Sequence, residues 1–397
     1  MNRWSVVLGA VLIQLCLGAI YAWSIFVEPL KKTFGYSQTE TQIIFSVALA
    51  SFALMMILAG RWQDCHGPKK IATLGGIVLG VGYLLAGQTG GSFIEIAATV
   101  GLVGGAGIGL AYVCPIAACV KWFPDKRGMV SGLAVAGFGA GALVFAKYGA
   151  MWITSAGVLS TFTYFGVIFL LAVVFGAQLL RNPPEGYKPE GWNPPATAAK
   201  ANGINLGGKE IIHTRQFWTL WLMFMFAATA GLMVIGNLKP FGVYSGLDAA
   251  TATTAVGVLA LANGAGRILW GTGSDKLGRK NSLAIMMLLQ GVMMLALMKM
   301  GATPLLLTIA VIWVGFNFGG NFALFPSATA DYFGTKNVGI NYGLIFTSYG
   351  VAGIVGPILA GSVFDKTGSY LWAFIPAGTA CLIAAGLALT LKAPTKK

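Results

Sequence analysis

The sequence predicts an all-α polytopic membrane protein with twelve membrane-spanning helices in two similar six-helix halves. Three observations predict this class. Hydrophobic residues make up 56% of the 397 residues, charged residues only 10%, and the mean hydropathy is +0.76. Twelve apolar stretches have about the 20 residues that a membrane span requires. A spaced set of glycines and charges also occurs twice along the chain.

The spans are expected in order at 5–27, 42–60, 71–89, 95–119, 129–152, 157–180, 216–238, 250–272, 281–299, 303–325, 341–363 and 369–391. The first stretch is too long for a signal-peptide core and has no obvious small-residue cleavage site, so we interpret it as a span. A polar segment rich in proline and glycine separates six spans from six. The predicted domains are therefore an N-terminal bundle at 1–180, a cytoplasmic linker at 181–215 and a C-terminal bundle at 216–397.

An internal repeat supports this division. Four residues of one predicted loop, Gly60, Asp64, Gly67 and Lys69, recur 211 residues later as Gly271, Asp275, Gly278 and Lys280. The same offset relates Pro115, Gly128, Gly132 and Gly139 to Pro326, Gly339, Gly343 and Gly350. The repeat predicts that the two halves are duplicates of one another.

The net charge of +14 could suggest a nucleic-acid partner, but the distribution of the basic residues excludes it. With the N-terminus inside, 19 of the 26 Lys and Arg residues lie on the cytoplasmic side and two, Lys147 and Arg267, lie within spans. Five lie outside: Lys31, Lys32, Lys239, Lys299 and Lys366. This positive-inside asymmetry predicts a plasma-membrane protein with both termini in the cytoplasm. The basic loops should contact anionic lipid headgroups.

Several chemical functions lack support in the sequence. Four cysteines, Cys16, Cys114, Cys119 and Cys381, fall within predicted spans, so no disulfide framework is indicated. Cys65 and His66 are adjacent without further ligands, which argues against a metal site. The glycine-rich run at 101–109 lies inside an apolar stretch and indicates close helix packing rather than nucleotide binding. A membrane enzyme would need a catalytic nucleophile, metal cluster or acid pair in the spans, and none is visible, so neither an enzyme nor a cofactor is expected.

The two repeated loops carry the first resemblance. Residues 60–70 and 271–280 both resemble the G-x3-D-x2-G-x-[KR]-[KR] loop of the major facilitator superfamily, which implies the major facilitator fold and transport. An Asp at a helix end can accept charge-assisted hydrogen bonds from basic side chains and helix N-terminal amides. We therefore expect a cytoplasmic gate formed by Asp64, Lys69, Asp275, Arg279 and Lys280; the alternative is that these charges only set topology. Gly67 and Gly278 should form tight turns.

A narrower resemblance indicates the substrate class. Residues 121–132, 324–336, 341–347 and 21–24 resemble the branch that contains oxalate:formate antiporters, monocarboxylate transporters and bacterial lactate transporters. In that branch an Arg in the eighth helix binds a carboxylate, which implies this role for Arg267. A guanidinium suits the role because it stays charged and meets two carboxylate oxygens with a planar fork. The alternative is that Arg267, only four residues before Gly271, extends to the cytoplasmic interface.

The other expected substrate contacts are aromatic and amide side chains. Asn263 shares a helix face with Arg267. The hydroxyls of Tyr21, Tyr112 and Tyr349 could donate hydrogen bonds. Further residues that resemble the family's binding site are Phe138, Phe318, Phe322, Phe346 and Asn321. Large apolar walls with few polar groups suit a small organic acid, although packing is the alternative role for each aromatic residue.

Two departures from the family narrow the substrate and the coupling. Tyr349 stands where oxalate carriers have a second cation, and one embedded positive charge matches one carboxylate, as in lactate or pyruvate. Asn263 stands where animal monocarboxylate transporters have an Asp, and among twelve acidic residues only Glu95 lies at a span. We therefore expect a monomeric carrier whose substrate enters with its own proton. Exchange of organic anions, such as oxalate for formate, is the alternative.

Overall fold

The computed structural model describes residues 3–36, 38–189 and 205–392. The first half contains α1 (Trp4–Leu17), the 3-10 segment η1 (Gly18–Ala22), α2 (Ser24–Phe34), α3 (Gln38–His66), α4 (Pro68–Ala86), α5 (Phe93–Ile96), the π-helical segment η2 (Ala97–Gly104), α6 (Gly105–Trp122), α7 (Arg127–Ala156) and α8 (Val158–Gln178). The second half contains α10 (Gly208–Ile211), α11 (Arg215–Tyr244), α12 (Ala249–Leu277), α13 (Arg279–Met300), α14 (Pro304–Phe333), α15 (Val338–Thr367) and α16 (Leu371–Leu389).

These helices agree with the predicted all-α membrane fold. Within the described residues, eleven helical runs are long and apolar enough to span a membrane. The remaining predicted span, at 250–272, coincides with α12. The first span differs from its prediction because η1 separates α1 from α2. At this point Gly18 packs closely on α7, since a Cβ at Gly18 would lie 1.9 Å from the carbonyl oxygen of Phe138.

The helix bounds reproduce the sequence repeat. Each of α12, α13 and α15 begins 211 residues after its counterpart, respectively α3, α4 and α7. The predicted tight turns are confirmed, since Gly67 precedes α4 with φ of 86° and Gly278 precedes α13 with φ of 80°. This left-handed region is one that glycine adopts without steric cost. The duplication therefore extends from the sequence to the backbone.

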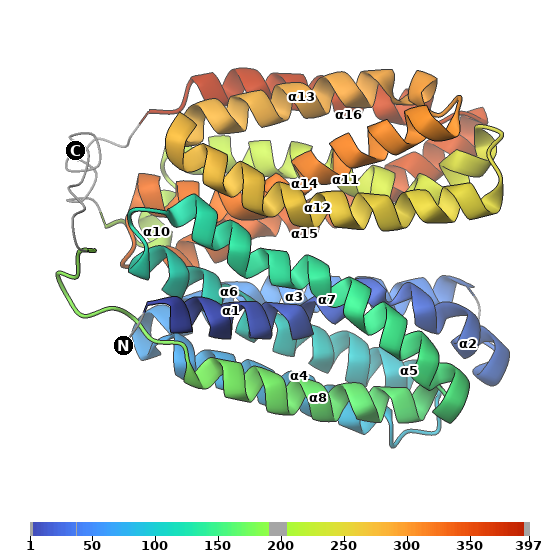
Figure 1. Cartoon of the computed structure of the whole chain (residues 1–397), viewed down its shortest axis with the longest axis horizontal. Coiled ribbons are helices and arrows are strands. Elements are labelled where there is room, and N and C mark those ends of the chain that lie inside the picture. The colour runs from blue at the N-terminus through green and yellow to red at the C-terminus, as the bar shows by residue number, and fades with distance from the viewer. Residues whose placement is uncertain (1–2, 37, 190–204, 393–397) are drawn as a thin grey trace. The chain divides into compact units, whose positions relative to one another are not determined.

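The described chain forms two compact units. One comprises residues 1–124, 133–192 and 335–344, and the other comprises 125–132, 193–334 and 345–397. In the first unit α4 packs along α8 and α3 along α6; in the second α13 packs along α16 and α12 along α14 (Figure 1). These pairings are equivalent under the repeat. The first turn of α7, from the first half of the sequence, therefore belongs to the second unit. The first turn of α15, from the second half of the sequence, belongs to the first unit.

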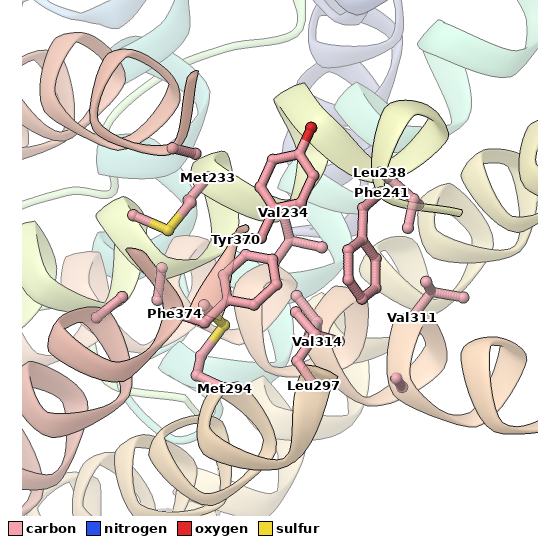
Figure 2. Packing of buried hydrophobic residues seen from close by; sticks show 14 of the residues in the cluster. Met233, Val234, Leu238, Phe241, Met294, Leu297, Val311, Val314, Tyr370 and Phe374 are labelled. Carbon is pink, nitrogen blue, oxygen red and sulfur yellow. The ribbon is translucent and has the colours of Figure 1, made fainter. Parts of the chain in front are cut away.

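The second unit contains a large apolar core. Side chains from α11, α13, α14 and α16 meet in this cluster (Figure 2). Met294 on α13 and Phe374 on α16 are both 1% exposed there. Burial of aliphatic and aromatic side chains of this size contributes about 1.5–3 kcal/mol each in water-exposed surroundings, whereas within a bilayer close packing provides the larger part. The cluster packs α11, α13, α14 and α16 against one another.

Candidate functional site

The carboxylate of Asp64 caps a helix that lies 275 residues further along the chain. Asp64 is in the last turn of α3, and its two oxygens accept from the backbone N–H groups of Gly339 (3.3 Å) and Ile340 (2.9 Å) at the start of α15. The ammonium of Lys121 lies 3.5 Å from Oδ1 of Asp64. A negative charge at a helix N-terminus is stabilised by the unpaired N–H groups and by the helix dipole.

Asp275 makes the equivalent contact in the second unit. Its two oxygens accept from the N–H groups of Gly128 and Met129, both at 2.9 Å, at the start of α7. These donors stand 211 residues before Gly339 and Ile340. Each half of the sequence thus supplies the carboxylate that caps a helix of the other half. Asp64 and Asp275, two residues of the predicted gate, therefore make equivalent helix-capping contacts.

The second cap carries a larger charge network than the first. Arg279 donates to Asp275 (2.6 Å) and to Asp331 (2.8 Å), and Asp331 also forms an ion pair with Arg127. The repeat counterpart of Asp331 is Val120, so the first cap has no equivalent of this acidic residue. Breaking a buried pair by removing one partner costs about 3–5 kcal/mol. The two caps are therefore chemically unequal.

The predicted gate residues differ in their surroundings. Lys69 is exposed and Lys280 half-buried, and neither belongs to the ion pairs found among the described residues. Sequence reasoning missed Lys121, Arg127 and Asp331 as members of the two cap networks. A signal was available for Arg127, which directly precedes Gly128, one of the repeated glycines. No repeat signal marked Asp331.

Arg267 is buried within the second unit. It is 1% exposed, its Nε donates to Oδ1 of Asn263 at 2.8 Å, and its guanidinium carbon lies 4.6 Å from the centre of the Phe322 ring. The four-residue spacing on α12 places the Asn and Arg side chains on one helix face. The repeat counterparts of Asn263 and Arg267 are Phe52 and Met56. The duplicated fold therefore accommodates apolar residues at both places.

Predicted substrate contacts of the second half gather around Phe322. Its ring centre lies 5.3 Å from that of Phe318, 5.5 Å from that of Tyr349 and 6.4 Å from that of Phe346. Asn321 is 1% exposed and donates from Nδ2 to the carbonyl oxygen of Phe318 at 3.1 Å. Phe322 thus connects this buried aromatic group to the Arg267 guanidinium.

Predicted contacts of the first half form a separate group in the first unit. The ring of Phe138 lies 5.1 Å from that of Tyr21 and 5.5 Å from that of Tyr112. Gln14 joins this group, since it is fully buried and donates from Nε2 to the carbonyl oxygen of Tyr112 at 3.1 Å. Sequence reasoning missed Gln14. Its isolated polarity within the first apolar stretch was the available signal.

A further tertiary contact lies in the connections on the predicted outer side. The Tyr36 hydroxyl donates to the carbonyl oxygen of Gly91 at 2.9 Å. Burial raises the pKa of Tyr36 to about 12, with smaller contributions from the negative charges of Glu40 and Glu95. Tyr36 therefore joins the connection before α3 to the loop before α5 as a neutral donor.

The duplicated helical architecture and the paired carboxylate caps define a membrane-embedded solute transporter. The family model described as Major Facilitator Superfamily matches residues 7–357. The chain belongs to this superfamily, and it is a multi-pass membrane transporter rather than an enzyme.

Two of the relatives are named as carriers of organic acids. The chain is 30% identical over 370 residues to the Oxalate:formate antiporter of Oxalobacter formigenes, covering 92% of this chain and 86% of that protein. It is 27% identical to Apicoplast pyruvate carrier 1 of Toxoplasma gondii, in a match that covers 87% of this chain and 81% of that protein. The solved structure of the transporter FucP matches with a TM-score of 0.74 at 16% identity, covering 96% and 97%, which shows the fold.

Proposed function

We propose that this transporter carries a small monocarboxylate such as lactate or pyruvate, and that Arg267 binds the carboxylate. The observation that carries the proposal is the placement of Arg267, which is almost fully buried, hydrogen-bonded to Asn263 and stacked on Phe322. A buried guanidinium held by a neighbouring side chain has little rotational freedom to lose on binding. Its planar donors fit the two oxygens of a carboxylate.

The surrounding aromatic groups support a small substrate with an apolar body. In the second unit Phe322 lies beside the guanidinium, the rings of Phe318, Phe346 and Tyr349 lie around Phe322, and Asn321 is buried on the same helix as Phe322. In the first unit Tyr21, Tyr112 and Phe138 form the second group of proposed contacts. A few polar groups among large apolar side chains favour a short organic acid.

The proposed coupling is symport with one proton. A transported charge changes its energy by about 2.3 kcal/mol for each 100 mV of membrane potential, and a proton that enters with a monocarboxylate cancels this term. The second candidate is exchange of organic anions, which the relationship to an oxalate:formate antiporter favours. The Tyr349 side chain, in place of a second cation, favours one carboxylate per substrate.

We infer that the two carboxylate caps act in alternating access. The proposed cycle exposes the Arg267 region to either side in turn, and the caps at α7 and α15 form in one state and separate in the other. In this proposal the gate lies on the cytoplasmic side, both termini are cytoplasmic, and a monomer in the plasma membrane is sufficient. Anionic lipid contacts the basic loops.

Uptake into proteoliposomes tests both substrate and coupling. Labelled L-lactate is supplied with an inward proton gradient, with a collapsed gradient, or to vesicles preloaded with formate or oxalate. Accumulation driven by the proton gradient alone supports symport, whereas uptake that requires a preloaded anion supports exchange. Absence of saturable uptake of any monocarboxylate under all three conditions contradicts the proposed substrate class.

Arg267→Ala tests the site with Lys147→Gln as the matched control. Loss of a charged hydrogen-bonding partner costs about 2–5 kcal/mol, so kcat/KM for uptake should fall at least about 30-fold. Lys147 is the other cation predicted within a span, and it is exposed on α7. Its substitution should leave uptake within about twofold of the unaltered protein. A folded Arg267→Ala protein with unchanged lactate uptake would exclude Arg267 as the carboxylate ligand.

A further inference from the structure

The second half contains buried amides at positions where the first half is apolar. Gln290 on α13 and Asn317 on α14 are each 2% exposed. Their counterparts under the 211-residue repeat are Leu79 and Ala106. Because the duplicated half folds with apolar residues at these places, the fold itself does not require the amides. Burial of an amide without a hydrogen bond costs about 1–3 kcal/mol on protein scales, so a binding role has to be considered.

One amide is fixed in orientation by a neighbouring indole. The Nε1–H of Trp270 on α12 donates to Oδ1 of Asn317 at 3.1 Å. An indole nitrogen only donates, so the amide oxygen must face Trp270 and the Nδ2 donors must point elsewhere. Among the described residues, neither Nδ2 of Asn317 nor either amide atom of Gln290 has a hydrogen-bond partner.

The helix register brings these amides to the same level. A Cβ built at Gly320 would lie 2.5 Å from the sulfur of Met286 and 2.7 Å from Cδ1 of Trp270, so α12, α13 and α14 converge there. Consecutive α13 and α14 run antiparallel through the short turn that follows Met300. Gln290 lies one turn after Met286, and Asn317 lies nearly one turn before Gly320. Because the two helices run in opposite directions, a step forward from Met286 and a step back from Gly320 lead toward the same end of the helix pair. Gln290 and Asn317 therefore lie at about the same level along it.

A direct bond between the two amides cannot satisfy them. If Nδ2 of Asn317 donated to Oε1 of Gln290, the two hydrogens on Nε2 of Gln290 would still lack an acceptor. An unsatisfied buried group costs about 1–3 kcal/mol. Water both donates and accepts, and buried waters in proteins make about three hydrogen bonds to polar groups of this kind.

We propose that α12, α13 and α14 enclose an internal hydration site, in which ordered water bridges Nδ2 of Asn317 and the amide of Gln290. Trp270, which binds Asn317, lies three residues after Arg267 on α12. The bound water therefore adds polarity to the interior of the helices that surround the buried guanidinium. The inference depends on the packing of the second unit and stands whether or not lactate is the substrate.

X-ray hydroxyl-radical labelling of the intact transporter tests for this water. Bound water that is ionised in place oxidises adjacent side chains even where bulk solvent has no access. Met286 and Met233 are the two probes, since Met286 is 1% exposed and Met233 is fully buried. The sulfur of Met286 lies at Gly320 beside Trp270, which binds Asn317, whereas Met233 on α11 belongs to the apolar cluster of Figure 2. We expect Met286 to be oxidised at least about tenfold faster than Met233.

Two variants assign the labelling to the amides. Gln290→Leu and Asn317→Ala introduce the residues that the first half has at the equivalent places, and each should reduce oxidation of Met286 to the rate of Met233. Unchanged slow oxidation of Met233 reports that each variant is folded. Equal rates for the two methionines in the unaltered protein would overturn the hydration site. Rapid oxidation of Met286 that persists in both variants would overturn its assignment to these amides.

Discussion

Replacement of Asp275 by Asn should release the first amides of α7. The carboxylate accepts from Gly128 and Met129, each at 2.9 Å, and an Asn side chain retains only one acceptor oxygen. One hydrogen bond to a charged group contributes about 1.5–3 kcal/mol, and the charge at the helix N-terminus about 0.3–1 kcal/mol. Arg279 keeps Asp331 as a partner, so its lost contact adds little. The expected loss is about 2–4 kcal/mol.

Hydrogen exchange measured by mass spectrometry gives a local readout of this loss. Since each 1.4 kcal/mol is a factor of ten, exchange at Gly128 and Met129 should accelerate by about 30-fold to 1,000-fold in the variant. Gly339 and Ile340 are an internal control, because Asp64 caps them through the equivalent contact.

Asp64→Asn should give the reciprocal result, with the larger acceleration of exchange at the start of α15 and a smaller one at the start of α7, because both caps separate in the same proposed motion. Unchanged exchange at both helix starts in both variants would refute the capping argument. Equal acceleration at both starts by either variant would show that the caps open only together in the proposed motion and not locally.

Three further tests, two of them with a control substitution, address other parts of the fold. Gly18→Ala should destabilise the protein by about 1–3 kcal/mol because the new Cβ would lie 1.9 Å from a backbone oxygen. Gly257→Ala, which has open space around its Cβ, should be neutral or stabilising, and equal thermal midpoints for the two variants would contradict this reasoning. Arg279→Gln should cost about 3 kcal/mol, whereas Lys280→Gln should change stability by less than about 0.5 kcal/mol; similar unfolding curves would refute the importance of the Arg279 ion pairs. Tyr36→Phe should cost about 1 kcal/mol through its lost hydrogen bond. The raised pKa of Tyr36 means that the folded protein holds the phenolic proton more tightly than the unfolded chain. The stabilisation that the protonated Tyr36 provides is therefore complete below pH ~10 and is lost as the pH rises to about 12. Thermal midpoints of the unaltered protein should fall more steeply over this range than those of the variant, and parallel pH profiles would contradict the assignment.

The backbone was the most predictable part of this protein because it depends on local and repeated features. Composition and span length predict the helices, and the repeat predicts the turns at Gly67 and Gly278, where the structure has positive φ. The interruption near Gly18 could not be predicted in the same way. It accompanies the close approach of another helix, which leaves no periodic pattern in the sequence.

The part of the candidate site that could be predicted consists of residue types that are rare in membrane spans. Arg267 stands out because charges are rare in membrane spans, and its spacing from Asn263 predicts their shared helix face. The partners of Asp64 could not be identified from spacing, because its backbone donors lie 275 and 276 residues away. Asp331 was missed for a different reason. Its counterpart is Val120, so a search guided by the repeat ignores it.

Because each half of the sequence supplies the carboxylate that caps a helix of the other half, the two helix starts acquire their partners at different times during synthesis. When the first turn of α7 leaves the ribosome, its partner Asp275 lies 147 residues further along the message from Gly128. At about 5–20 residues per second, those amides wait roughly 7–30 s for their acceptor. The first turn of α15 has no such delay, because Asp64 is already in place when Gly339 is made. The nascent N-terminal half therefore has the longer period in which insertion factors or chaperones can engage an incomplete helix start.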